Sequence, residues 1–245
     1  MATVSWKPPS DILPGDHSAY RLTEWLGSGG MGTVYKAVAP TRLPDMELAV
    51  KFLTVPSLAD TALFEQFKLE AQIGLTVRHQ YISNTHEFLD LRGWDGWVPA
   101  AIVMAYHETS LQRVLCDLKQ TRQQLPPDVV PAITFQLSQA LFELHTVHRL
   151  VHRDIKPSNV LVWLPGGHRY VGPHSLTGGK AVLADFGVAC TVGAQPNLQL
   201  KQDGWKPAEL FDANGDSLRY HRATAAEDIF AFGKLLQTVG RANCI

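Results

Sequence analysis

The sequence has little of what marks several common classes of protein. Its 3 cysteines, Cys116, Cys190 and Cys244, are far apart and lack the paired spacing of a zinc site. We therefore expect reduced thiols rather than a disulfide framework or a structural metal. The formal net charge of −1 gives no electrostatic reason to expect nucleic acid or an anionic membrane surface as the main partner.

Long apolar runs are also missing. The longest, Val98 to Tyr106, is too short to span a bilayer, and residues 1–11 have neither the basic start nor the apolar core of a signal peptide. These absences predict an intracellular, cytoplasmic protein with no membrane segment, and they leave its oligomeric state open. The 245 residues, 45% hydrophobic and 18% charged, are enough to build one large domain or two small lobes.

Residues 151–161, Val-His-Arg-Asp-Ile-Lys-Pro-Ser-Asn-Val-Leu, are the most informative stretch of the chain. The carboxylate of Asp154 could accept a proton from a hydroxyl nucleophile, and Asn159, five positions later, could turn back to hold a divalent cation. This spacing predicts a loop rather than one face of a helix or strand. A surface turn of ordinary polar residues is the alternative, and the extended pattern with its apolar flanks argues against it.

A glycine-rich turn at residues 27–32 lies between two stretches that alternate as half-buried strands do, Tyr20–Leu26 and Thr33–Val38. Glycines at such a turn let backbone amides approach phosphate oxygens without interference from Cβ atoms. A dinucleotide-binding fold would need a helix directly after the glycines, and no helical pattern follows. The turn therefore indicates a phosphate-binding hairpin more than a Rossmann fold.

Lys51 is the single cation in the apolar strand Leu48–Leu53. A lysine with apolar neighbours is unfavourable unless its amine is paired. It could reach solvent at a sheet edge, or it could bind nucleotide phosphates while a carboxylate from the following helix, residues 59–77, holds it. Glu70 is the best candidate for that carboxylate, and Glu65 is its rival.

The second half of the chain is predicted to be mostly helical. A long helix is expected at 128–148, because apolar residues recur there at helical spacing after two prolines. Strands are expected at 160–164 and 181–184, and the second of these leads directly to Asp185. Asp185 and Asn159 offer oxygen ligands of the kind that Mg²⁺ prefers.

In this order the motifs resemble those of the eukaryotic-type (Hanks-type) Ser/Thr protein kinase family, over roughly Tyr20 to Gly240. The resemblance implies an α+β, bilobal protein-kinase-like fold. After a lead-in at 1–19, we expect an N-lobe at about 20–106 with an antiparallel sheet and one main helix. A mostly helical C-lobe would occupy 107–245, shortened relative to the family because the chain ends soon after the helix at 228–239.

The resemblance also implies a reaction, the transfer of the ATP γ-phosphoryl group to a Ser or Thr hydroxyl of a protein, with ATP and Mg²⁺ as cofactors. Asp154 would be the catalytic base, and Lys156, typical of Ser/Thr members, would stabilise charge on the transferred group. Asn159 and Asp185 would ligate Mg²⁺. Asp228 matches the family's buried helix aspartate that braces the catalytic loop.

By the same resemblance Lys51 would contact the ATP phosphates while paired with Glu70. The remaining nucleotide-binding positions would lie in the glycine loop and around the adenine ring. They are Leu26, Gly27, Ser28, Gly29, Gly30, Met31, Gly32 and Thr33 in the loop, and Val34, Ala49, Met104 and Leu161 around adenine.

The chain also departs from the family pattern. Gln202 stands where a Ser/Thr kinase normally has a threonine that positions the substrate hydroxyl, and no Ser, Thr or Tyr lies between Thr191 and Glu209 to accept an activating phosphate. Glu209 would be a buried carboxylate without its usual arginine. Gly74, four residues after Glu70, replaces a bulky apolar residue and should leave a cavity.

These departures support a second hypothesis, a catalytically weak or inactive kinase-fold binding module or fragment. A third, a small-molecule phosphotransferase, fits less well, because the sequence around Asp154 has the protein-kinase form.

Overall fold

The structure is a computed structural model that describes residues 8, 10–15, 18–29, 32–39, 43–54, 61–92, 98–164, 169–195, 202–218 and 221–242. The chain divides into two compact units. The sheet unit comprises Met1–Arg78 and Asn84–Tyr106, and the helical unit comprises His79–Ser83 and His107–Ile245. The boundary near residue 106 agrees with the expected one, whereas no pattern in the sequence assigns the short segment at 79–83 to the helical unit.

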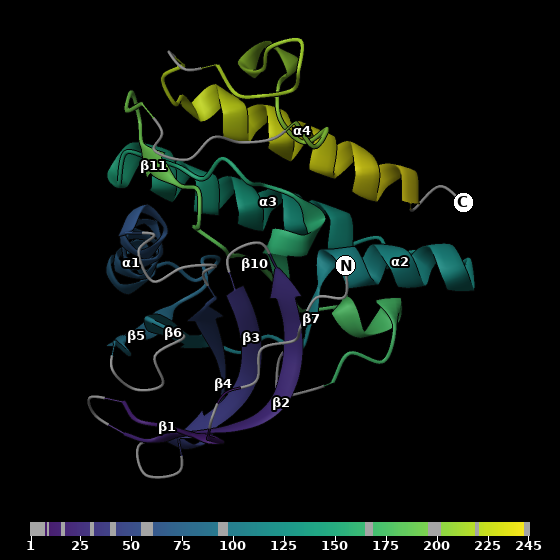
Figure 1. Ribbon diagram of the computed structural model, residues 1–245. Helices are drawn as coiled ribbons and strands as arrows, with labels where there is room; N and C mark the ends of the chain where they lie inside the picture. The colour runs from purple at the N-terminus through teal and green to yellow at the C-terminus, as the bar shows by residue number, and fades with distance from the viewer. Residues whose placement is uncertain are drawn as a thin grey trace. The chain divides into compact units, whose positions relative to one another are not determined.

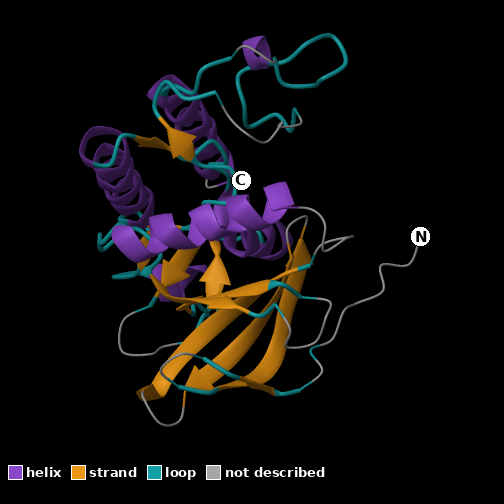
Figure 2. Cartoon of the chain, turned by 60° about the vertical axis from the view of Figure 1, so that its left-hand side comes forward, coloured by secondary structure: helices purple, strands orange, loops and turns teal. Residues whose placement is uncertain are grey.

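One antiparallel sheet dominates the sheet unit, with its 6 strands in the order β1-β2-β3-β4-β6-β5 (Figures 1 and 2). The strands are β1 (Ile12–Leu13), β2 (Tyr20–Gly29), β3 (Gly32–Ala39), β4 (Leu43–Leu53), β5 (Thr85–Asp90) and β6 (Ala100–Ala105). Helix α1 (Thr61–Thr76) packs against the sheet through Phe67 and Ala71, which contact Leu53 and Ile102. The α+β class expected for this part of the chain is therefore confirmed.

The core of the sheet begins earlier than predicted. Leu13 is fully buried among Tyr20, Leu22 and Val50, and the backbone N–H of Leu22 donates to the carbonyl of Asp11 at 2.7 Å. Residues 12–13 therefore form an edge strand rather than part of a lead-in. The prediction was wrong here because two residues are too few to show an alternating pattern.

The helical unit contains three α-helices, α2 (Leu111–Thr121), α3 (Val129–Phe142) and α4 (Ala225–Ala242), in the part of the chain that is described. Its strands are β7 (Thr109–Ser110), β8 (Leu150–Val151), β9 (Val160–Trp163), β10 (Lys180–Leu183) and β11 (Cys190–Thr191). Short 3₁₀ helices lie at Pro157–Asn159, Pro173–Leu176 and Ala208–Leu210. Helices α3 and α4 contact each other and run side by side in Figure 1.

The long helix predicted at 128–148 is regular only as far as Phe142, and a π-helical turn, Glu143–Val147, continues it. The apolar stripe is core, as expected, since Ile133, Leu137, Leu141 and Leu144 are all buried. A π turn inserts one residue relative to the helical repeat, so side chains beyond it point in directions that the 3.6-residue period does not predict.

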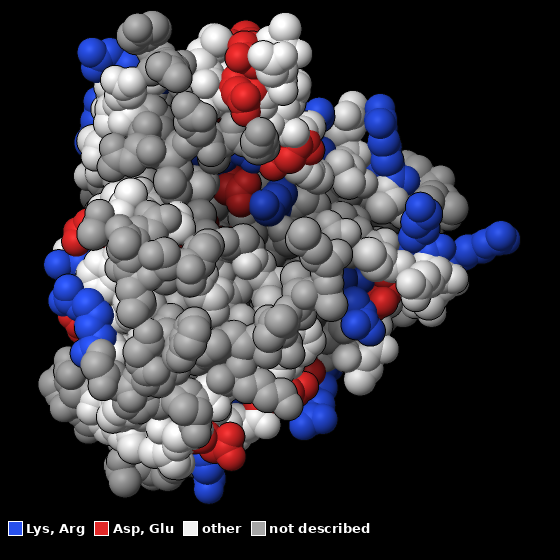
Figure 3. Space-filling view, viewed as in Figure 1, with Lys and Arg blue, Asp and Glu red and all other residues white. Residues whose placement is uncertain are grey.

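No described helix is both long and apolar enough to cross a membrane. On the face drawn in Figure 3, acidic and basic side chains lie in several places, including an adjacent pair of opposite sign in its upper half. Cys116 and Cys190 are free thiols, and Cys244 lies outside the described residues.

Candidate active site

Strand β4 and helix α1 bring Lys51 and Glu70 together in the sheet unit. The amine Nζ of Lys51 lies 2.7 Å from Oε1 and 3.0 Å from Oε2 of Glu70. Both side chains are largely buried, with 12% and 7% exposure, so each charge needs the other. The pairing predicted from sequence is confirmed, while Glu65, the rival carboxylate, is exposed.

Strands β2 and β3 form the glycine-rich hairpin, in which Ser28 faces Thr33 and Gly29 faces Gly32. A Cβ atom at Gly29 would meet nothing within 4 Å, whereas one at Gly32 would lie 2.0 Å from the carbonyl oxygen of Phe52. Gly29 thus leaves open space, as a phosphate-binding turn requires, but the close approach of β4 accounts for glycine at position 32. Gly30 and Met31 lie outside the described residues.

The residues expected around an adenine ring are distributed over both units. In the sheet unit Ala49 is the cross-strand partner of Met104, and Val34 is that of Lys51. In the helical unit Leu161 lies on β9, half-buried, opposite Val182 of β10. Leu26, on β2, is partly exposed.

The cavity predicted at Gly74 does not exist. A Cβ atom placed there would lie 2.1 Å from Oγ1 and 2.9 Å from Cβ of Thr85, so the side chain of Thr85 already fills this space. The prediction was wrong because it compared Gly74 with a bulkier residue without knowing its neighbour. Glycine allows α1 to lie close to β5, and no methyl group fits between them.

In the helical unit the catalytic-loop residues converge on Asp154. Asn159 donates from Nδ2 to both Oδ2 and the backbone carbonyl of Asp154, each at 2.8 Å. The amine of Lys156 lies 2.7 Å from Oδ2. The 3₁₀ turn at Pro157–Asn159 produces this return of the chain, and proline at its first position fixes the backbone for it.

Electrostatics keep Asp154 ionised. Burial alone would raise the pKa of this carboxyl, but the hydrogen bond from Lys156 and the charge of Lys206 outweigh it and hold the pKa below its ordinary value. An ionised carboxylate can accept a hydrogen bond from a hydroxyl group, and its weak basicity favours orienting that hydroxyl over removing its proton early.

Asp228, at the start of α4, braces the backbone of the loop, as expected. Its fully buried carboxylate accepts from the backbone N–H of His152 at Oδ2 and of Arg153 at Oδ1, both at 2.8 Å. Arg153 has a φ of 67°, which is unfavourable for a side chain with a Cβ atom, so this hydrogen bond helps to hold a strained residue. His145, from the π-helical turn, places Nε2 at 2.7 Å from Oδ2, a contact that the sequence did not predict.

Arg153 also has a buried carboxylate partner that the sequence analysis missed. Its Nε lies 3.4 Å from Oε2 of Glu227, and Oε1 of Glu227 accepts from the backbone N–H of Thr224 at 2.8 Å. Thr224 and Glu227 have the spacing of a helix capping box, which is the sequence signal for this carboxylate. Glu209, in contrast, is exposed, so the expectation of a buried carboxylate at that position is wrong.

The oxygen atoms expected to ligate Mg²⁺ suit a cation of that kind. Because Nδ2 of Asn159 is bonded to Asp154, the amide oxygen Oδ1 faces away from that carboxylate. Asp185, exposed and in a left-handed conformation with φ of 68°, follows Ala184, whose N–H donates to the carbonyl of Asn159 at 2.9 Å. No described group of three or more His, Cys, Asp or Glu forms a metal site. Two protein ligands fit Mg²⁺, which keeps waters and substrate phosphates in its remaining positions.

The segment at 202–206 contributes a residue that the sequence analysis missed. Gln202, flagged as a departure, is exposed. Lys206 instead reaches Asp154, with Nζ 3.2 Å from Oδ1, and it also pairs with Asp203. The charged pair three residues apart was visible in the sequence, but its proximity to Asp154 depends on the path of the loop.

Comparisons with known proteins identify the family of this chain and several of its relatives. The family model described as protein kinase domain matches residues 20–242. The chain is 29% identical over 217 residues to the serine/threonine-protein kinases PknA of Corynebacterium glutamicum, covering 87% of this chain and 41% of that protein. It is 33% identical over 175 residues to the serine/threonine-protein kinase PknF of Mycobacterium tuberculosis, covering 70% of this chain and 32% of that protein.

An α+β fold with a Lys–Glu pair in one unit and an Asp–Lys–Asn loop in the other is typical of protein kinases. Because the family model matches most of its length, the chain belongs to the protein kinase family. It spans about two fifths or less of the length of these curated relatives, at 41% and 32%.

Proposed function

We propose that this chain is a protein kinase that transfers the γ-phosphoryl group of ATP to a Ser or Thr hydroxyl of a protein. The observation that carries the proposal is the environment of Asp154, an ionised carboxylate held by Asn159 and Lys156. Similarity to relatives named as serine/threonine kinases supports the choice of hydroxyl.

Each unit would contribute named groups to the reaction. In the sheet unit Lys51, held by Glu70, would bind nucleotide phosphates, with Gly29 leaving room for their approach. In the helical unit Asn159 and Asp185 would hold Mg²⁺. When bound, ATP supplies the phosphoryl group, and the cation neutralises part of its charge.

Asp154 would orient the attacking hydroxyl and finally accept its proton. The hydroxyl oxygen forms a bond to the γ-phosphorus of ATP while the bond from that phosphorus to the bridging oxygen breaks. The electron pair of the broken bond leaves with ADP, and the proton passes to a carboxylate oxygen of Asp154. Lys156 would stabilise the charge on the transferred group.

Phosphate incorporation from ATP and Mg²⁺, into the chain itself and into a generic basic protein, tests this proposal. Asp154→Asn should reduce the rate by about 100-fold or more, because it removes the acceptor of the hydroxyl proton. Asp128→Asn, which neutralises an exposed carboxylate at the start of α3, is the matched control and should leave the rate unchanged.

If the folded wild-type chain binds ATP but transfers no phosphate, the binding-module hypothesis replaces this one. Equal rates for Asp154→Asn and the wild type would also refute the proposed role of Asp154.

A further inference from the structure

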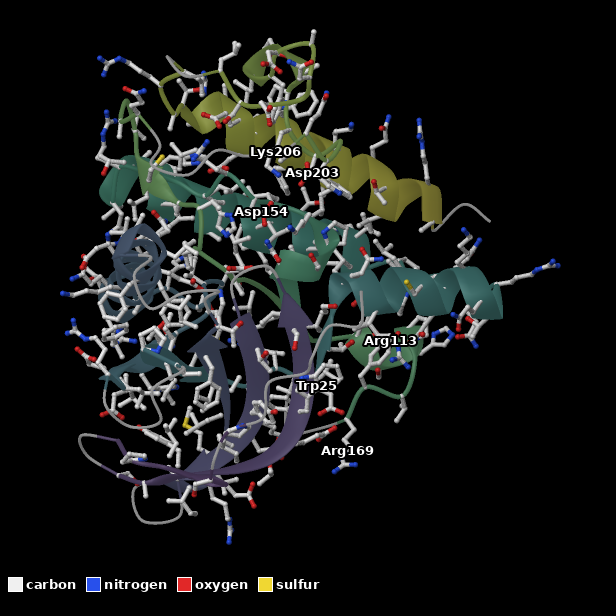
Figure 4. All side chains as sticks on the ribbon, viewed as in Figure 1. Trp25, Arg113, Asp154, Arg169, Asp203 and Lys206 are labelled. Carbon is white, nitrogen blue, oxygen red and sulfur yellow. The ribbon has the colours of Figure 1, made fainter. Side chains whose placement is uncertain are left out.

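A second lysine, Lys206, contacts Asp154 at the carboxylate oxygen that Lys156 and Asn159 do not contact. Lys156 and Asn159 both contact Oδ2, at 2.7 and 2.8 Å, whereas Nζ of Lys206 lies 3.2 Å from Oδ1. Figure 4 shows Asp154, Asp203 and Lys206 close together in the helical unit. Each oxygen of the carboxylate therefore faces one ammonium group.

Lys206 is held in this position by its surroundings. Its side chain is only 8% exposed, and its amine has a second partner in Oδ2 of Asp203 at 2.5 Å. A buried lysine is unfavourable without such partners, and a long side chain loses rotamer freedom when it is fixed. The two carboxylates that contact this amine offset both the cost of burying its charge and the loss of side-chain entropy.

The backbone around Lys206 is fixed as well. Oδ1 of Asp203 accepts from the N–H of Trp205 at 3.0 Å, which closes a turn just before Lys206. Lys234, on α4, donates to the carbonyl of Gly204 at 2.5 Å and ties that turn to the helix. Asp203 therefore holds Lys206 in two ways, by closing the turn that precedes it and by pairing with its amine.

We propose that Lys206 is a positioning residue for Asp154 in phosphoryl transfer, a role that rests on the function proposed above. With Oδ2 engaged by two donors and Oδ1 by one, the carboxylate cannot rotate freely, and Oδ1 keeps capacity to accept from an incoming hydroxyl. The amine also adds positive charge where the carboxylate must stay ionised. Neither Gln202 nor any other described residue of the 202–206 segment reaches Asp154 in this way.

The test compares steady-state phosphate transfer by the wild type, Lys206→Met, Asp203→Asn and the control Lys119→Met. Lys119 is an exposed lysine in the last turn of α2, outside the site. Lys206→Met should lower kcat by about 10- to 100-fold, the scale of a small misplacement of a reacting group. The KM for ATP should stay within about twofold, since Lys206 touches no residue assigned to ATP phosphates.

A conservative variant, together with the separation of kcat from KM, distinguishes positioning from a purely structural role. Lys206→Arg keeps a cation that can contact Oδ1 of Asp154 and should recover part of the lost kcat, whereas a general structural defect would also raise the KM for ATP. Asp203→Asn keeps the lysine but removes its second partner, so it should lower kcat by less than Lys206→Met does. Thermal unfolding of each variant shows whether the fold is intact, and Asp203→Asn carries the test if Lys206→Met does not fold.

The outcomes distinguish this inference from the function on which it rests. An active wild type with unchanged kcat in Lys206→Met would overturn the positioning role and leave the kinase proposal standing. A faster Lys206→Met would overturn it too, because the lysine would then obstruct the carboxylate. A folded wild type without transfer would refute the proposed function itself, and the positioning role with it.

Discussion

Replacing Gly74 with alanine tests how closely α1 and β5 approach. In most helices this substitution stabilises a protein, because alanine has a helix propensity about 1 kcal/mol more favourable than glycine. At Gly74 the new methyl group would lie 2.1 Å from Oγ1 of Thr85. Rotating Thr85 does not solve the problem, since its Cβ atom would remain at 2.9 Å and cannot move without the backbone.

The expected result is a loss of stability. Overpacking of a buried contact costs about 1–3 kcal/mol, whereas the gain in helix propensity is about 1 kcal/mol. The cost therefore equals the gain at the lower end of its range and exceeds it elsewhere. We therefore expect Gly74→Ala to lower the free energy of unfolding by up to about 2 kcal/mol, measured by urea denaturation with circular dichroism. Glu70 lies one helical turn earlier, so a displaced α1 should also weaken its pairing with Lys51 and raise the KM for ATP.

Gly233→Ala is the matched control, because Gly233 is exposed within α4 and a Cβ atom there would meet nothing within 4 Å. It should raise the free energy of unfolding by about 0.5–1 kcal/mol. The double variant Gly74→Ala/Thr85→Ala should recover part of the lost stability, because it removes the Oγ1 atom. If Gly74→Ala stabilised the protein as much as Gly233→Ala does, the close approach inferred from the structure would be refuted.

Three further predictions concern buried charged and titratable groups. Glu70→Gln should lower kcat/KM for ATP by about tenfold or more, the value of a lost charge-assisted hydrogen bond to Lys51, while Glu65→Gln should have no effect in the same assay. Asp228→Asn turns an amide donor toward backbone N–H groups and should lower the free energy of unfolding in urea by about 2–4 kcal/mol; an unchanged midpoint would contradict the bracing role. Burial lowers the pKa of His107 from its ordinary value of 6.5 to about 4, so its contribution to stability is complete above pH 6.5 and is lost as pH falls toward 4. The urea midpoint of the wild type should therefore fall between pH 7 and pH 5, and that of His107→Phe should fall less. An equal fall in the two proteins would rule out His107 as the cause.

Motifs with a local physical cause were predictable from the sequence. The Lys51–Glu70 pair followed from a cation in an apolar strand and a carboxylate on the next helix, because a buried lysine requires a partner. The five-residue spacing of Asp154 and Asn159 predicted a loop, and in the structure Asn159 turns back to contact Asp154. The bracing role of Asp228, which accepts two backbone hydrogen bonds from that loop, was predicted from the family resemblance.

Contacts set by the path of the chain were not predictable. Gly74 was expected to leave a cavity, but the side chain that fills the space comes from a strand whose register the sequence does not specify. Lys206 reaches Asp154 only because a turn at Asp203 and a hydrogen bond from Lys234 direct it there. His145 meets Asp228 from a π-helical turn, which no apolar periodicity reveals.

The most direct test of the proposed function is the identity of the phosphorylated residue. A mixture of peptides that carry Ser, Thr or Tyr would be incubated with ATP, Mg²⁺ and either the wild-type chain or Asp154→Asn, and phosphorylated side chains identified by mass spectrometry. The account predicts phosphoserine or phosphothreonine with the wild type and none above background with Asp154→Asn. Equal phosphorylation by both proteins, or phosphotyrosine alone, would contradict it.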